Sequence, residues 1–259
     1  MASWYAGIAD RYVETWDLVT PEVFARRTLE RGATKQLEPS AFDDELVAAV
    51  AQRLGEPVSV LHPSLMYRLF SEFWSGHRAM GFLDAHTRYE PVAPPVVVDP
   101  HVLPRDYVAV KLYEARSMPG TPEVRALVSQ IVERLAERAP VVLLDTGLVL
   151  DEHADYGVGT SSHVVSARPW MTPATNLAVQ TQIIAGARAF VGTCGSVAWL
   201  SPMLGVHTSA LYVDPKWLHV HLGVALRATH KMGAGCFAPV DLRGLEPLGL
   251  GLPVTVRTS

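Results

Sequence analysis

The stretch AFVGTCGSVAWLSPMLGVHTSALYV, residues 189–213, combines a strand, a helix and a second strand in one unit. Its ends, 189–192 and 207–213, are short apolar runs of the kind that form parallel strands buried on both faces of a sheet. Between them, residues 196–204 have the spacing of a short helix, and Gly205 follows as its stop. The stretch therefore predicts a strand–helix–strand unit with two parallel strands.

The same alternation extends on both sides of this unit. The helix after 120 has Thr121 as its N-cap and Pro122 as its first residue, and its apolar side chains lie on one face. Further strands are predicted at 107–113, 140–147, 162–167 and 236–240, and further helices at 172–187 and 215–230. This pattern predicts an α/β fold, a Rossmann-like doubly wound parallel sheet of five or six strands over residues 107–240.

The first part of the chain has a different pattern. Residues 21–32 and 40–55 have helical patterns, whereas 91–106 contain five prolines and are typical of a stiff connector. We predict four parts: a smaller, partial α/β N-terminal domain (1–95), a Pro-rich linker (96–106), the Rossmann-like domain (107–240) and a C-terminal tail (241–259).

Composition excludes several classes of protein. The 259 residues carry a formal net charge of −4, so no basic surface for nucleic acid is predicted. No apolar run is long enough for a membrane helix, and the N-terminus lacks the pattern of a secretory signal, so we expect a cytoplasmic protein. Two cysteines do not form a disulfide framework. The acidic stretch DEHADYG (151–157) lacks further ligands at metal spacing and is interpreted as an exposed loop, so no metal is expected.

The polar loop after the 189–192 strand is the main candidate site. In a doubly wound sheet, ligands bind beyond the carboxyl ends of the strands, where loops enter helix N-termini. Gly195 allows close approach of the backbone, the hydroxyls of Thr193 and Ser196 add donors, and the N–H groups of the next helix attract an anion. We therefore predict that Thr193, Cys194, Gly195 and Ser196 cradle a phosphate, with a lowered thiol pKa for Cys194. The alternative is a simple turn in which Ser196 caps the helix.

Other candidate residues occupy comparable strand ends and helix starts. Lys111 and Arg116 are candidates for contacts with a diphosphate, and Thr146 and Gly147 for a nucleobase. The structural alternatives are a lysine that snorkels at the strand edge and a turn capped by Asp145. A second set, Asn176 and Gln180, shares one helix face; these residues are candidates for the donor sugar or base, or belong to a solvated face.

The residues FVGTCGSVAWLSPMLGVHTSALY (190–212), preceded by NLAVQTQIIAGARA (176–189), resemble the donor-binding half of bacterial GT-B glycosyltransferases, broadly the heptosyltransferase and fucosyltransferase-like groups. Members more often have an aromatic residue and a second Gly at positions 194 and 196, and Pro at 207. The resemblance implies a nucleotide-sugar donor, no bound metal or cofactor, and transfer to a cell-envelope or capsular glycan acceptor.

Other functions stay open. The domain is alternatively a non-catalytic nucleotide-binding module or a truncated remnant of a GT-B protein, or another GT-B-like enzyme such as a sugar-nucleotide epimerase or a pyruvyl transferase. The catalytic base is unassigned; His62 and Glu72 are candidates. If the N-terminal domain is partial, a partner or an oligomer is expected to cover its aromatic residues, which are Trp4, Tyr5, Tyr12, Trp16, Tyr67, Phe70, Phe73 and Trp74.

Overall fold

The structure is a computed structural model, and it describes residues 22, 26, 41–58, 75–86, 91–92, 96–147, 154–172, 175–216, 218–233 and 235–244. Two compact units divide the chain: one comprises Met1–Ile8 with Tyr89–Ser259, and the other comprises Ala9–Arg88. The predicted boundaries at 95, 106 and 240 are a finer division and remain predictions.

The larger unit contains a six-stranded sheet in which every strand is parallel to its neighbours. The strands lie in the order β3-β2-β1-β4-β5-β6. Their bounds are β1 (Val108–Lys111), β2 (Val141–Leu143), β3 (Val164–Ser166), β4 (Ala189–Thr193), β5 (Thr208–Tyr212) and β6 (Phe237–Asp241). The predicted fold class is confirmed. Because the strand order reverses between β1 and β4, the crevice at their carboxyl ends is the position at which such sheets bind ligands.

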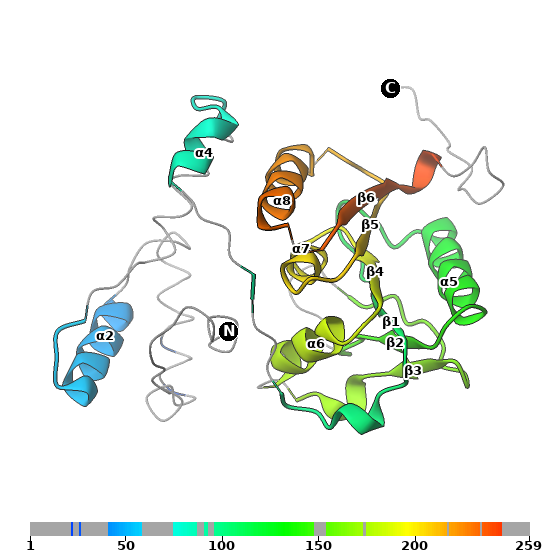
Figure 1. Cartoon of the computed structure of the whole chain (residues 1–259), viewed down its shortest axis with the longest axis horizontal. Helices are drawn as coiled ribbons and strands as arrows, with labels where there is room; N and C mark the ends of the chain where they lie inside the picture. The colour runs from blue at the N-terminus through cyan, green and yellow to red at the C-terminus, as the bar shows by residue number, and fades with distance from the viewer. Residues whose placement is uncertain are drawn as a thin grey trace. The chain divides into compact units, whose positions relative to one another are not determined.

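Helices cover both faces of the sheet (Figure 1). One face packs against α5 (Pro122–Ala136), and the other packs against α6 (Asn176–Ala185), α7 (Ser196–Met203) and α8 (His219–Met232). Residues of β1 alternate between the two cores: Ala109 belongs to the core beneath α6 and α7, while Val108 and Val110 belong to the core beneath α5. This two-sided burial explains why the strands are apolar without interruption.

Two helix starts test the capping predictions. Helix α5 begins as predicted: the Thr121 hydroxyl accepts a hydrogen bond from Val124 N at 3.3 Å, and Pro122 occupies the first helical position. The prediction that α6 starts at Thr172 is wrong, because its N-cap is Thr175 and its side chain makes no capping bond. The two threonine hydroxyls instead lie 2.8 Å apart, and the Thr172 carbonyl accepts from Asn176 N.

Part of the Pro-rich segment is held against α6 by one side chain. The Oε1 atom of Gln182 accepts hydrogen bonds from Val97 N at 2.6 Å and Val98 N at 2.7 Å, and its Nε2 atom donates to the Val98 carbonyl at 2.6 Å. The side chain of Val98 is buried in the core beneath α6 and α7. The chain is therefore attached to the sheet domain before the first strand begins.

The end strand β6 contains a proline. The Cys236 carbonyl, just before β6, accepts from Thr208 N and so points toward β5. Because backbone groups alternate in direction along a strand, Pro239 has its nitrogen on the side away from β5. Proline has no N–H, so the ladder between β5 and β6 loses no donor there.

The smaller unit is described mainly by α2 (Ala41–Leu54) and α4 (Met80–His86). Helix α2 forms where the sequence predicts a helix, with acidic residues in its first turn and Gly55 following at a φ of 70°. The eight aromatic residues expected to be exposed, and the candidate bases His62 and Glu72, lie outside the described residues.

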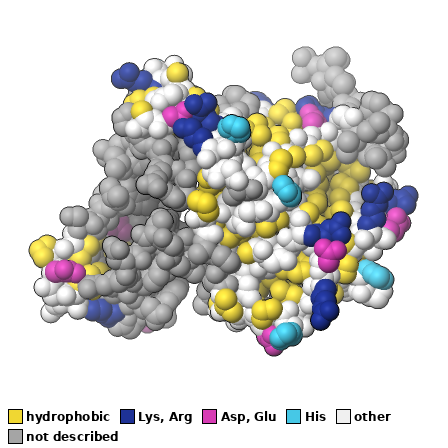
Figure 2. Space-filling model, in the orientation of Figure 1, with side chains coloured by type: hydrophobic (Ala, Val, Ile, Leu, Met, Phe, Trp, Pro, Cys, Tyr) yellow, Lys and Arg dark blue, Asp and Glu magenta, His cyan; other side chains and the backbone are white. Residues whose placement is uncertain are grey.

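None of the helices in the described part of the chain has the length and apolar character that crossing a membrane requires. On the face visible in Figure 2, basic side chains stand beside acidic ones or singly, without gathering into one basic patch among the described residues.

Candidate functional site

The loop that follows β1 crosses the carboxyl end of β4. The Thr193 hydroxyl, at the end of β4, donates to the Tyr113 carbonyl at 2.9 Å and accepts from Tyr113 N at 3.0 Å. Further along the loop, the Ser117 carbonyl accepts from Val213 N and Asp214 N, just beyond β5. The predicted site residue Thr193 therefore binds this loop and fixes its course across the crevice between β1 and β4.

Tyr113 places its hydroxyl at the N-terminus of α7. A Cβ atom built on Gly195 would overlap the Tyr113 hydroxyl oxygen, so the absence of a side chain at 195 makes room for it. Burial, with a further contribution from Cys194, raises the pKa of Tyr113 to about 12. The phenol is therefore neutral at pH 7 and can donate a hydrogen bond.

Helix α7 begins without a side-chain cap. Its N-cap residue is Gly195, and Ser196 is the first helical residue, so the interpretation of Ser196 as the cap is wrong. The N–H groups of the first turn have no acceptor within the helix, and they carry the positive end of its dipole. Ser196 is exposed, so this end of the helix reaches the surface.

Cys194 differs from its prediction. Its side chain is buried in the core beneath α6 and α7, and burial raises the pKa of its thiol to about 11. The prediction of a lowered pKa is wrong because the residue extends the strand, with its N–H bonded to the Leu211 carbonyl, and its sulfur lies among apolar side chains. Cys194 is a core residue.

Lys111 ends β1 and forms a buried ion pair. Its Nζ atom lies 2.6 Å from Asp155 Oδ1, and both side chains are about 10% exposed, so Lys111 does not snorkel into solvent. The other carboxylate oxygen, Oδ2, accepts from Thr146 N at 2.7 Å, Gly147 N at 3.1 Å and Thr146 Oγ1 at 3.2 Å. Three of the predicted site residues thus converge, and they converge on a carboxylate of the same chain.

The environment of Asp155 corrects the interpretation of 151–157 as an exposed loop. Burial alone would raise the pKa of the Asp155 carboxyl, but the bond and charge of Lys111 and the amides of Thr146 and Gly147 together lower it. Asp155 is therefore ionised at neutral pH. Residues 151–153 lie outside the described residues.

The two groups of residues lie on one side of the sheet edge. Tyr113 and Asp155 are partners in an antiparallel bridge, which Glu114 N extends by donating to the Ala154 carbonyl at 2.8 Å. Opposite residues of such a pair project to the same face, as does Lys111 two residues before Tyr113. A continuous row of polar groups results, from the 146–147 turn through Lys111 and Tyr113 to Gly195.

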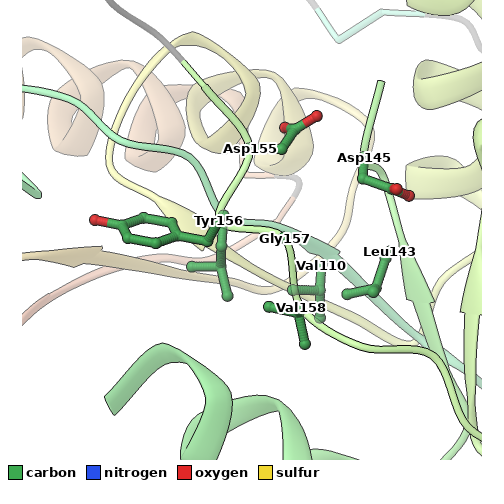
Figure 3. A pocket seen from close by; sticks show the side chains of 8 residues that line it. Val110, Leu143, Asp145, Asp155, Tyr156, Gly157 and Val158 are labelled. Carbon is green, nitrogen blue, oxygen red and sulfur yellow. The ribbon is translucent and has the colours of Figure 1, made fainter. Parts of the chain in front are cut away.

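A small cavity lies beside this row (Figure 3). Its volume is about 20 Å³, enough for one water molecule. The apolar side chains of Val110, Leu143 and Val158 line one side, while Asp145 and Asp155 lie on the other. This cavity is too small for a nucleotide.

The other predicted residues have separate positions. Arg116 is exposed in the turn between Ala115 and Met118. Gln180 donates to Asn176 Oδ1 at 3.3 Å, as expected for two residues on one helix face. The side of the helix at Gln180 is not solvated, because this residue is only 6% exposed. Asp145 accepts from Ser166 Oγ at 2.6 Å and therefore binds β3.

Two residues of the site, Tyr113 and Asp155, were not predicted. Tyr113 follows Lys111 at the strand spacing of two, which was a usable signal for a second side chain at the same edge. The position of Asp155 depends on contacts with residues 9 and 44 positions away in the chain, and no local pattern encodes such contacts.

Comparison with known proteins adds little to this site. No protein-family model matches the chain, and no curated protein matches it. A solved structure, KpsC, beta Kdo 2,4 transferase, from Thermosulfurimonas dismutans, is 11% identical, with a TM-score of 0.32. The similarity covers 48% of this chain and 38% of that one, and at this TM-score it does not establish a relationship.

Proposed function

We propose that the sheet domain binds the diphosphate of a nucleotide at the N-terminus of α7, and that the protein is a glycosyltransferase with a nucleotide-sugar donor. The observation that carries the proposal is the position of Gly195, which opens α7 beside β1, where the strand order reverses. Such a position combines free helical N–H groups, a favourable dipole and a backbone without a side chain in the way. The nucleotide sugar and the glycan acceptor come from the resemblance to GT-B enzymes.

The chemistry that this site supports is stabilisation of a leaving group. In glycosyl transfer, an acceptor hydroxyl attacks the anomeric carbon, the bond from that carbon to the diphosphate oxygen breaks, and the nucleoside diphosphate leaves with the electron pair. The first turn of α7 would stabilise the developing negative charge, and the neutral Tyr113 hydroxyl would donate to a phosphate oxygen. The acceptor's proton goes to a base that we do not assign.

One observation favours the second candidate, a nucleotide-binding module without turnover. Asp155 is the bridge partner of Tyr113, and its two carboxylate oxygens already accept from Lys111, Thr146 and Gly147. A carboxylate with a lowered pKa and four donors is a poor general base. Turnover then depends on a base from elsewhere in the chain.

Titration of the ¹⁵N-labelled full chain with nucleosides, nucleoside diphosphates and their sugar conjugates tests the proposal. We expect the diphosphates to shift the amide signals of Gly195, Ser196 and Val197. Tyr113→Phe should weaken binding by about 1.5–3 kcal/mol, as for other hydrogen bonds to charged groups. Ser129→Ala, on α5, is the matched control because it also removes one hydroxyl. Equal affinity for nucleosides and diphosphates would rule out the diphosphate site. Release of free sugar from a bound donor would separate a transferase from a binding module.

A further inference from the structure

The donors around Asp155 are of the kinds that proteins use to bind phosphate. Two consecutive amides, of Thr146 and Gly147, point at one carboxylate oxygen together with the Thr146 hydroxyl, and the Lys111 ammonium meets the other oxygen. Gly147 has a φ of 67°, the left-handed conformation that turns successive N–H groups into an anion-binding concavity. Four donors of three types enclose this one carboxylate.

A second cation lies at the same turn. A Cβ atom on Gly147 would lie 2.7 Å from Arg168 Cζ, so the guanidinium packs directly against this glycine. Arg168 also pairs with Asp145, with Nη2 at 3.2 Å from Oδ2. Each cation at the turn is thus matched by one carboxylate, and Asp145 and Asp155 line the same small cavity (Figure 3). A phosphate group with two negative charges carries as much charge as the two carboxylates together. One phosphate can therefore replace both carboxylates as the partner of the two cations.

The position of the turn also suits a ligand. Lys111 ends β1 and Thr146 comes after the adjacent strand β2, so both lie at the carboxyl edge of the sheet, where ligands of this fold bind. Gly147 is exposed, so the turn is open to solvent on one side. If Asp155 leaves, Lys111 is left buried without a counter-charge, and a buried ion pair that loses one partner is strongly destabilised. Another anion is therefore needed whenever Asp155 moves out.

We propose that Lys111, Thr146, Gly147 and Arg168 form a phosphate-binding cradle, and that Asp155 occupies it as an internal anion that a phosphate group must displace. Asp155 acts as a built-in competitor: the apparent affinity for phosphate is reduced by the fraction of molecules in which the carboxylate holds the cradle. The cradle shares no residue with the diphosphate site proposed at α7, so a failure of one proposal does not overturn the other.

The test is an NMR titration of the ¹⁵N-labelled full chain with inorganic phosphate, with ionic strength held constant by sodium chloride. We expect the amide signals of Thr146 and Gly147 to shift, and Asp155→Asn to bind phosphate about tenfold more tightly than the wild type because the competing charge is gone. Adding Lys111→Met to Asp155→Asn should abolish the gain. Asp44→Asn, an exposed change of equal charge on α2, should leave the affinity unchanged.

The outcomes are distinct. If Asp155→Asn binds phosphate no more tightly than the wild type, Asp155 is solely a structural partner of Lys111 and the proposal is overturned. If Asp155→Asn does not fold alone, phosphate at constant ionic strength should restore the fold, and failure to do so overturns the proposal as well. A second titration, with a nucleoside diphosphate, distinguishes the source of the phosphate. If the diphosphate shifts the amide signals of both Gly147 and Gly195, one ligand spans both sites. If Gly147 shifts with inorganic phosphate but not with the diphosphate, the cradle binds a separate ligand.

Discussion

The hydroxyl of Tyr113 occupies the space in which a side chain at Gly195 would begin. The rest of the tyrosine ring leaves room, since the same Cβ atom would lie 3.4 Å from Tyr113 Cζ, an ordinary van der Waals contact. The conflict therefore involves a single oxygen atom. Gly195 and Tyr113 form an interdependent pair at the crevice between β1 and β4.

A double-mutant cycle measures this dependence. We expect Gly195→Ala to lower the free energy of unfolding by about 1–3 kcal/mol, the usual cost of overpacking. In the Tyr113→Phe background the same substitution should cost much less, because the overlapping oxygen is gone. Urea unfolding of the four proteins gives the coupling energy, and a coupling near zero would mean that the tyrosine moves aside freely.

The Lys111–Asp155 pair predicts the pH dependence of stability. The folded-state pKa of Asp155 is below its ordinary value of 3.8, so the carboxylate stabilises the folded state above about pH 5, and this contribution is lost as the pH falls through the folded-state pKa. Asp155→Asn should therefore lower stability at pH 7 by about 3–5 kcal/mol, as for other broken buried pairs. Its stability should also depend less on pH between 5 and 3. Unfolding curves at several pH values measure both effects, and parallel curves for variant and wild type would contradict this assignment.

Gln182 should control the attachment of residues 97 and 98. Gln182→Ala removes three hydrogen bonds, each with a net contribution of about 0.5–1.5 kcal/mol, so we expect a loss of about 1.5–4.5 kcal/mol. Hydrogen exchange of the Val97 and Val98 amides should accelerate, while exchange in β1 changes less. Gln130→Ala, at an exposed position of α5, provides the control. Unchanged exchange at Val97 and Val98 would show that the segment is held by other contacts.

The two cysteines should react with thiol reagents at very different rates. Cys236 is exposed, whereas Cys194 is 3% exposed and burial raises its pKa to about 11. At pH 8 we expect one rapid reaction per molecule, which Cys236→Ser removes, and a slow one that becomes rapid in denaturant. Rapid modification of Cys194 in the folded protein would contradict its place in the core.

The features that were predictable from the sequence are those encoded locally. Apolar runs between amphipathic helices predicted a parallel sheet of five or six strands, and the structure has six. The Thr121-Pro122 pair predicted the start of α5. The helix predicted from 172 instead begins after Thr175, and the hydroxyl of Thr175 bonds that of Thr172. Local pattern does not decide between such partners.

The candidate site was only partly predictable for the same reason. The sequence placed Lys111, Thr146 and Gly147 at strand ends, but their common partner Asp155 reaches them through a bridge between distant segments. Cys194 precedes a helix in the sequence, yet the direction of its side chain depends on the strand that it continues. Side-chain direction and long-range pairing are properties of the assembled sheet.

The proline in β6 has a consequence for contacts between molecules. A parallel sheet that ends in an ordinary strand offers a row of N–H and C=O groups on which a strand of another chain can add, and this is a common start of aggregation. Pro239 has its nitrogen on that outer side, so an added strand would find a missing donor and a pyrrolidine ring near the middle of β6. Intermolecular growth of the sheet beyond β6 is thereby disfavoured, while the pairing with β5 inside the molecule is unaffected.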